Sequence, residues 1–294
     1  MRRFLWLLMV LMVVSGCGPT QTVDSTAVSA ETGLSMVLKV PDGADPAVVD
    51  RAAEIITLRI ADLDEVAESD ISVTDGETIT VEILGITDSN RAVSLVTSPG
   101  RLSFRPVLEA SMLISPLLGP DQSVSTRQLP AEIDPDTGLT VSDDPTQEAW
   151  LAEYAEDGSV LWVYDVGPSQ LSGADLDNVL ARFVGGPTDD GMWQVELDMS
   201  GEGADKFQEM TREAASQPLD DPRRQIAIVL DGKVVSAPYV SESVDPDVGI
   251  DGGMAVITVG TIENQEHAAQ DLAVVLRHGA LPVSFEVVSV SLLH

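Results

Sequence analysis

The chain has 294 residues, of which 48 are Asp or Glu and 16 are Lys or Arg, so its formal net charge is −32. Such a surface repels phosphate, which excludes nucleic acid as a partner. A hydrophobic content of 44% is enough to build a buried core. The single cysteine cannot form an internal disulfide and excludes metal sites built on paired cysteines, and we expect no cofactor.

The first 16 residues have the pattern of a signal peptide. Arg2 and Arg3 supply a positive start, and residues 4–14 form an unbroken apolar run. As a helix this run would be about 16 Å long, well short of the roughly 30 Å hydrocarbon core of a bilayer. We therefore interpret residues 1–16 as a cleaved leader, and no later apolar run is long enough to span a membrane.

Cys17 follows two small residues, and the sequence Val-Ser-Gly-Cys at 14–17 resembles the bacterial lipoprotein box. In such a box the cysteine is the lipid-attachment residue and becomes the new N-terminus. The alternative is an ordinary cleaved signal with an incidental cysteine. Residues 17–32 are small, polar and aperiodic, which is typical of a flexible tether. The expected location is the extracytoplasmic face of the cell membrane, with membrane lipid as a partner through Cys17.

Residues 33–109 predict alternating strands and helices in the order βαββαβ, a ferredoxin-like unit. Apolar residues at helical spacing indicate a helix over 46–63, buried on one side. Asp75 and Gly76 predict a hairpin turn between two strands. The predicted strands are 34–40, 71–73, 78–84 and 101–108, and the second helix is 89–97.

Residues 110–157 are rich in proline and acid, including two Asp-Pro pairs, and predict an irregular excursion with one short helix over 147–154. We place a boundary between two subdomains here. Beyond it, Asp231 and Gly232 predict a second hairpin. The strands predicted in this part are 160–166, 192–199, 223–230, 233–239 and 254–260. The helices predicted are 173–182, 200–215 with Ser200 as N-cap, and 261–278 with Thr261 as N-cap and Gly279 beyond its end.

Residues 282–293 form a final strand with enough β-branched residues to be buried. The fold class is therefore α+β, in two parts. Among the aromatic residues, Trp193 alternates with Val195 and Leu197, which favours a place in the core over a place on a binding surface.

Three stretches carry a family resemblance. Residues 207–211 (FQEMT), 224–238 (RQIAIVLDGKVVSAP) and 271–283 (DLAVVLRHGALPV) resemble the large extracytoplasmic first domain, P1, of SecD, a subunit of the bacterial protein-export machinery. Residues 55–63 and 100–107 are similar to the N-terminal half of that domain. The resemblance covers residues 33–293 apart from the acidic excursion.

The resemblance implies a ferredoxin-like base, formed by residues 33–109 and 282–293, with an inserted head at 158–281. It marks as structural or partner-contact positions Phe207, Thr211, Asp231, Gly232, Ser236, Ala237, Pro238, Arg277, Gly279 and Pro282. The chain departs from the family where SecD has Gly-Leu-Asp-Leu-x-Gly-Gly, because residues 33–39 keep only the first two. The membrane helices that would conduct protons are absent from the sequence, so proton-driven export is not implied.

A catalytic constellation is not recognisable. His267 and His278 are three helical turns apart and are expected to be solvated, and His294 is terminal. The Asp-rich segments 134–138 and 245–249 lack the later ligands of a calcium loop and indicate surface turns. The Asp231-Gly232 turn and residues 236–238 are interpreted first as fold-specifying.

Two functions remain open. The first is a non-catalytic module that binds exported polypeptides or Sec translocase components. The second is an envelope scaffold or small-ligand-binding lipoprotein that uses the same fold outside protein export. A hydrolase is disfavoured for want of a catalytic constellation.

Overall fold

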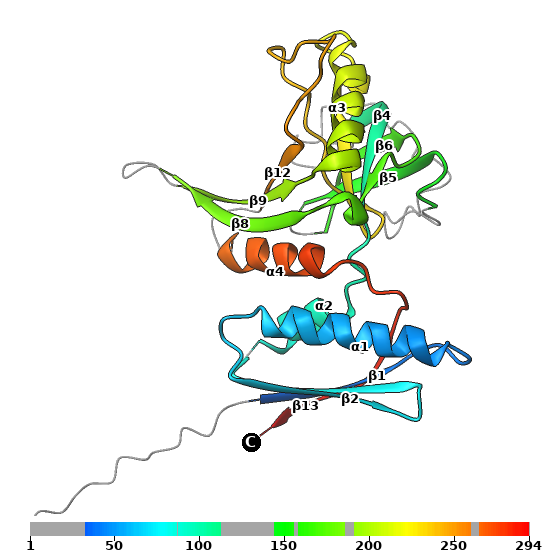
Figure 1. Ribbon diagram of the computed structural model, residues 1–294, viewed down its shortest axis with the longest axis vertical. Helices are drawn as coiled ribbons and strands as arrows, with labels where there is room; N and C mark the ends of the chain where they lie inside the picture. The colour runs from blue at the N-terminus through cyan, green and yellow to red at the C-terminus, as the bar shows by residue number, and fades with distance from the viewer. Residues whose placement is uncertain are drawn as a thin grey trace, which may run out of the picture. The chain divides into compact units, whose positions relative to one another are not determined.

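The computed structural model describes residues 33–86, 88–112, 144–155, 158–185, 191–259 and 265–293 (Figure 1). The chain divides into two units, Met1–Glu31 and Thr32–His294, and every described residue belongs to the second. Within the described ranges, no helix is both long and apolar enough to cross a bilayer. The predictions for Cys17, the tether, Thr261 and most of the acidic excursion fall outside these ranges.

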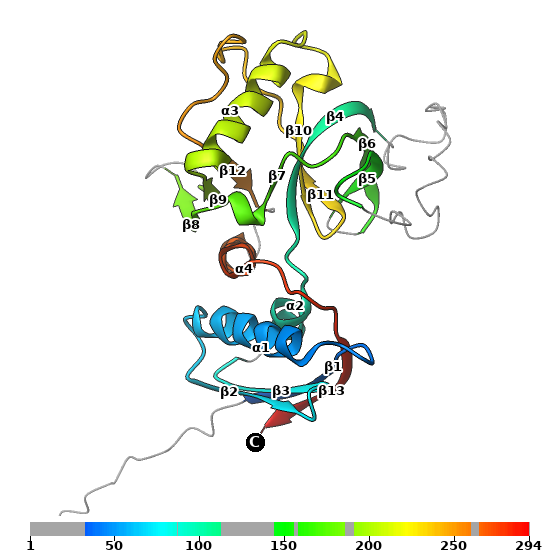
Figure 2. The same cartoon turned by 45° about the vertical axis from the view of Figure 1, so that its right-hand side comes forward.

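A four-stranded antiparallel sheet has the strand order β13-β1-β3-β2. Its strands are β1 (Gly33–Lys39), β2 (Glu68–Thr74), β3 (Thr78–Leu84) and β13 (Glu286–Leu293). Helices α1 (Pro46–Ala61) and α2 (Ser89–Thr97) cover one face of this sheet (Figures 1 and 2). This is the expected ferredoxin-like arrangement.

The fourth position of that sheet is filled by a strand from the far end of the chain. We expected the strand at 101–108 to close the βαββαβ unit, and this was wrong, because β4 (Leu102–Met112) pairs with β6, β7 and β10 in another sheet. β13 instead pairs with β1 along its whole length, from Gly33 opposite Leu293 to Lys39 opposite Glu286. The C-terminal strand therefore completes the fold begun by the N-terminal strands.

Local sequence explains the two helices and the hairpin of this part. The Asp45 side chain accepts a hydrogen bond from the Ala47 amide and precedes Pro46, a favourable start for α1. The Asp88 side chain caps α2 in the same way. In the β2–β3 turn, Asp75 and Gly76 have φ angles of 54° and 69°, as a type I′ turn requires. The predictions for these elements are confirmed.

A second sheet has the order β10-β11-β5-β6-β4-β7, and β10 also pairs with β4, so five of its strands form a closed ring. Closure leaves those five strands without a free edge. The strands besides β4 are β5 (Ala149–Tyr154), β6 (Val160–Val166), β7 (Leu171–Ser172), β10 (Ile226–Leu230) and β11 (Lys233–Ser236). The helix predicted over 147–154 was wrong, because residues 149–154 pair with β6 as β5.

A third sheet contains β8 (Asn178–Val184), β9 (Met192–Asp198) and β12 (Met254–Thr258), in the order β12-β9-β8. The helix predicted over 173–182 was wrong. Only a 3-10 turn, η1 (Gly173–Asp175), forms there, and Val179 and Ala181 alternate inward opposite Leu197 and Val195 of β9. Pairing along seven residues with β9 overrides the weak helical pattern.

Two helices complete this part, α3 (Gly201–Ala215) and α4 (Gln265–His278), with a further 3-10 turn, η2 (Pro222–Arg224). α4 belongs to two hydrophobic cores. Val274 and Val275 pack with α1, α2 and the four-stranded sheet, whereas Ala269, Ala273 and Leu276 pack with the other two sheets and α3. Trp193 is partly buried against the second core, as expected.

The final strand, which we predicted to be buried, is an exposed edge. Val288 and Leu292 retain 58% and 54% of their surface. β13 has a neighbour on one side only, and the helix layer does not bury its apolar side chains. Apolar composition alone could not distinguish this edge from a central strand.

Candidate functional site

Two chain segments connect the four-stranded sheet with the other two sheets, and they lie side by side. Residues 98–101 lead from α2 into β4, and residues 279–281 lead from α4 toward β13. The Leu281 amide donates a hydrogen bond of 2.7 Å to the Pro99 carbonyl. We call these two segments the crossing segments, and the candidate site is built on them.

The Asp231 carboxylate holds the first crossing segment. It accepts hydrogen bonds from the Ser98 hydroxyl at 3.0 Å, the Gly100 amide at 3.1 Å and the Arg101 amide at 2.8 Å. Asp231 can point there because it occupies the β10–β11 turn with φ 52°, followed by Gly232 with φ 79°. The predicted hairpin turn is confirmed, and its aspartate also fixes the start of β4.

Arg59 of α1 holds both crossing segments from the other side. Its guanidinium is fully buried and donates to the Leu95, Ser98 and Gly279 carbonyls at 3.0, 2.6 and 2.8 Å. Its Nε is buried without a partner within the described residues. Burial lowers the pKa of Arg59 to about 10, although the nearby Asp231 carboxylate raises it. Arg59 therefore remains charged at neutral pH.

Glycines make this close approach possible. Gly100 has φ 71°, and a Cβ there would lie 2.7 Å from Nη2 of Arg59 and 2.8 Å from Cγ1 of Val275. Gly279 has φ 79°, which ends α4 and turns its carbonyl toward Arg59. A side chain at position 100 would push Arg59 away from its carbonyl partners.

A groove of about 690 Å³ opens beside the crossing segments. Among the described residues its wall is largely apolar and is made of small side chains and backbone, with Arg101 as the one charged residue. The lining residues are Gly100, Arg101, Leu102, Ser103, Pro145, Thr146, Pro168, Ser169, Ser172, Gly173, Ala174, Gly232, Gly279 and Ala280. An apolar groove with backbone polar groups at hand can bind an extended chain with a few apolar side chains.

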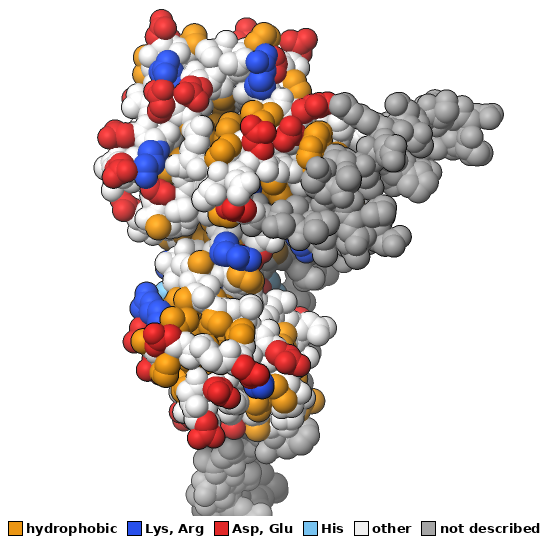
Figure 3. Space-filling model, turned by 90° about the vertical axis from the view of Figure 1, so that its right-hand side faces the viewer, with side chains coloured by type: hydrophobic (Ala, Val, Ile, Leu, Met, Phe, Trp, Pro, Cys, Tyr) orange, Lys and Arg blue, Asp and Glu red, His pale blue; other side chains and the backbone are white. Residues whose placement is uncertain are grey.

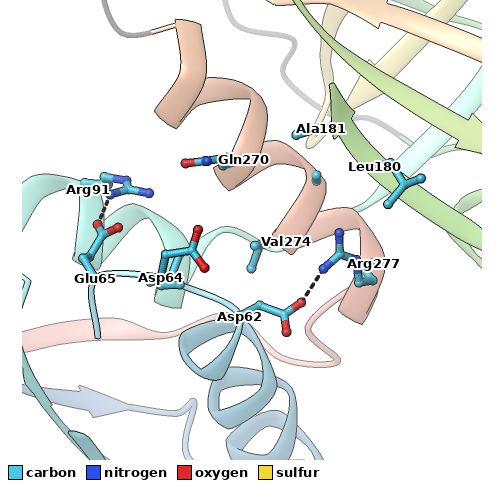
Figure 4. A pocket seen from close by; sticks show the side chains of 11 residues that line it. Asp62, Asp64, Glu65, Arg91, Leu180, Ala181, Gln270, Val274 and Arg277 are labelled. Carbon is cyan, nitrogen blue, oxygen red and sulfur yellow. Dashed lines mark hydrogen bonds and ion pairs between the residues drawn. The ribbon is translucent and has the colours of Figure 1, made fainter. Parts of the chain in front are cut away.

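A smaller cavity of about 170 Å³ lies where α4 meets the end of α1 and the start of α2 (Figure 4). Arg91 pairs there with Glu65 and, at 2.6 Å, with Asp271, whose hydrogen bond raises the pKa of Arg91. Arg277 pairs with Asp62 at 2.7 Å and donates to the Val179 carbonyl at 2.9 Å. These charged side chains pair with one another. We therefore interpret them as ion pairs that attach α4 to α1 and α2, and not as a ligand site.

His278 takes part in the same attachment. Its Nε2 lies 2.8 Å from Oδ2 of Asp62, and only 14% of its side chain is exposed. Although burial raises the pKa of Asp62, the hydrogen bonds from His278 and Arg277 lower it below its usual range. We expected His278 to be solvated, and this was wrong, whereas His267 on the same helix is exposed.

The other motif residues lie in three places. Phe207 is buried and meets Phe104 edge to face at 6.3 Å. The buried Thr211 hydroxyl donates to the Phe207 carbonyl and accepts from the Ile250 amide. Ser236 is the last residue of β11, Ala237 and Pro238 follow it, and Pro282 is exposed. Of the ten, Gly232 and Gly279 line the groove, and Asp231 holds the crossing segment beside it. The functional roles of all ten stay predictions.

Sequence reasoning missed three buried arginines, Arg59, Arg105 and Arg224. Arg224 donates to four carbonyls, those of Ala215, Gln217, Val240 and Ser241, and so fastens the end of α3. Arg105 donates to the Gly167 and Gln147 carbonyls beside the groove. A signal was present, because Arg59 and Arg105 stand inside otherwise apolar segments of a chain that is poor in basic residues.

Replacing Asp231 tests whether its carboxylate holds the first crossing segment. We expect Asp231→Asn to lower the free energy of unfolding by about 2 kcal/mol, because charge-assisted bonds to two amides and a hydroxyl are weakened. Asn tolerates positive φ, so the turn itself should persist. Chemical denaturation measures the effect, with Asp75→Asn as the control.

Asp75 is matched to Asp231 because it has φ 54° in the β2–β3 turn. Within the described residues its side chain makes no hydrogen bond. Equal losses in the two variants would show that the Asp231 carboxylate does not hold the crossing segment.

The fold is an α+β domain in two parts, joined by the two crossing segments, with the groove beside them. Residues 49–109 match the family model of the N-terminal P1 domain of protein translocase subunit SecDF, and residues 151–283 match that of the SecDF P1 head subdomain. The chain therefore belongs to the SecD family, as a P1 domain.

Individual relatives agree. The protein translocase subunit SecDF of Thermus thermophilus is 30% identical over 97% of this chain and 33% of its own length. The SecD subunit of Syntrophobacter fumaroxidans is 31% identical over 82% of this chain and 38% of its own length. The chain thus spans only about a third of the length of these relatives.

Solved structures show the same fold. A crystal structure of SecDF in a super-membrane-facing form has a TM-score of 0.59 and 28% identity, over 90% of this chain and 30% of that one. A structure described as a membrane component SecDF that enhances protein export has a TM-score of 0.55, over 87% of this chain and 98% of that one. The predicted family and fold class are confirmed.

Proposed function

We propose that this protein is a non-catalytic module that binds polypeptide in its groove on the extracytoplasmic side of the membrane, in association with protein export. Its relatives are named as subunits of the protein translocase, and one solved relative is described as enhancing protein export. The groove beside the crossing segments is the observation that carries the proposal. The Sec translocase is the partner that the family relationship suggests.

The chemistry of the groove favours polypeptide. Small side chains such as Ala174 and Gly173 leave room for a backbone to approach closely, and Ser103 and Ser172 supply hydrogen-bonding groups. Arg101 is the one charged side chain in the described part of the lining, which favours contacts that do not depend on the sequence of the bound chain. A module that binds many different exported chains needs a surface with low sequence specificity.

Crosslinking from the groove tests polypeptide binding. With a photo-reactive amino acid in place of Ala174, which lies at the rim, we expect adducts with secreted polypeptides during their export. The control places the same group at Leu219, which is 54% exposed and lies outside the groove. Adducts that are equally abundant from both positions, or absent from both, would contradict the proposal.

We also propose that Cys17 carries the lipid anchor, as the sequence around it predicts. Two acyl chains, at about 0.8 kcal/mol per buried CH₂, hold a protein stably on a bilayer, whereas one chain does so only marginally. Cys17→Ser should abolish palmitate labelling and leave the protein soluble or uncleaved, with an unchanged melting temperature for residues 33–293. Labelling that persists in the variant would show that the anchor lies elsewhere.

A further inference from the structure

The three-stranded sheet β12-β9-β8 has two faces of different character. Most of its odd-numbered side chains belong to the second core, where Val179, Val195, Leu197 and Ile257 are at most 2% exposed. Its even-numbered side chains form the opposite face, which we call the outer face. Strand alternation assigns these two faces directly from the register of the sheet.

The outer face is rich in exposed apolar side chains. Five of the sixteen large apolar residues that the described part of the chain exposes lie on it. They are Leu180 at 37%, Val184 at 44%, Met192 at 42%, Met254 at 53% and Val256 at 39%. None of them lines the large groove.

Cross-strand pairing places these residues side by side and puts acids among them. Val184 is opposite Met192, and Glu196 lies between Leu180 and Val256. Met254 is opposite Asp198. The one basic residue of the outer face, Arg182, pairs with Glu196 at 3.0 Å, which leaves Asp198 with a hydrogen bond from Asn178 and no cation within the described residues.

Charge decides between the possible occupants. A second copy of a chain with net charge −32 would be repelled, and an anionic lipid surface would be repelled for the same reason. A cationic amphipathic segment meets both features of the outer face, because its apolar side can cover Met254 and Val256 while Lys or Arg reaches Asp198, which has no cation within the described residues.

We propose that the outer face of β12-β9-β8 docks a cationic amphipathic polypeptide segment, with its apolar side against the sheet and a basic residue at Asp198. This site is separate from the groove and does not depend on what the groove binds. A helix is the form of the segment that fits best, since amphipathic helices pack their apolar stripe on the flat face of a sheet.

The test uses the full chain and two fluorescent 18-residue peptides, a Leu/Lys amphipathic helix and its isomer with Glu in place of Lys. We expect fluorescence anisotropy to show binding of the Lys peptide, weakening as salt rises from 50 to 500 mM, and no binding of the Glu peptide. Met254→Ser with Val256→Ser should weaken binding about tenfold. Equal binding of both peptides would overturn the charge argument.

The control pair is Leu219→Ser with Val248→Ser, which are 54% and 45% exposed and lie off the sheet. It should leave binding within twofold of the wild type, and unchanged melting temperatures in all variants would exclude misfolding. Dimerisation, or flotation with zwitterionic vesicles, that the Met254/Val256 variant abolishes would overturn the proposal in favour of a second copy or a lipid surface. Groove crosslinking from Ala174 should be unaffected by either pair.

Discussion

Replacing Arg59 by Met is expected to lower the free energy of unfolding by about 3 kcal/mol. Met keeps most of the buried volume but leaves the Leu95, Ser98 and Gly279 carbonyls without their donor. Each buried carbonyl left unsatisfied costs about 1–3 kcal/mol, partly offset because a buried charge is also removed. Urea denaturation of the Arg59→Met variant and of the wild type measures this loss.

The control is Arg51→Met on the same helix. Arg51 has a 60% exposed side chain, and its one ion pair within the described residues is with Glu54, three residues away. Its loss should therefore change stability by less than about 0.5 kcal/mol. If the two variants lost equal stability, the hydrogen bonds of Arg59 would not be needed to hold the crossing segments. If Arg59→Met also reduced crosslinking from Ala174 under conditions where the protein remains folded, the crossing segments would be shown to shape the groove.

Gly100→Ala is expected to cost about 2–4 kcal/mol, from two sources. A side chain at φ 71° is strained by about 1–2 kcal/mol, and the added Cβ overlaps Arg59 and Val275. Thermal denaturation should show a lowered midpoint. The overlap is also expected to displace Arg59, so that a double variant with Arg59→Met costs less than the sum of the two single changes.

Gly43 offers a matched control for this substitution. Its φ is +81°, and nothing lies within 4 Å of the place where its Cβ would be. Gly43→Ala therefore reports the backbone strain alone, and the difference between the two variants reports the overlap at the junction. Equal losses of stability in the two variants would mean that Arg59 and Val275 move to accommodate the methyl group.

Elements with strong local signals could be predicted from the sequence. α1 has an Asp-Pro start and an apolar stripe, and the Asp-Gly pairs at 75–76 and 231–232 adopt the positive φ angles that their turns require. Each signal acts within a few residues, so it survives without knowledge of the rest of the chain. The same holds for Gly279, which ends α4.

The errors arose where distant pairing decides. Residues 178–184 became β8 because β9 lies beside them, and residues 149–154 became β5 because of β6. The strand predicted at 101–108 pairs with β10 as part of β4 and does not pair with β1. Strand propensity depends on the neighbours that a strand meets, which no local window contains.

The candidate site divides in the same way. The motif around Asp231 and Gly232 was visible in the sequence, and it led to the family. The contacts that hold the crossing segments were not visible in the sequence. Asp231 bonds to a segment more than 130 residues earlier, and Arg59 bonds to Gly279, 220 residues later.

The sequence by itself thus determined the family, the acidic charge, the predicted leader with its lone cysteine, and the turns that act within a few residues. Only the tertiary structure decided that the strand after α2 leaves the first sheet, where the groove lies and which arginines hold the crossing segments beside it. The physical reason is that buried carbonyls and sheet edges need hydrogen-bond donors and neighbouring strands. The packing of the whole domain determines which residues supply them.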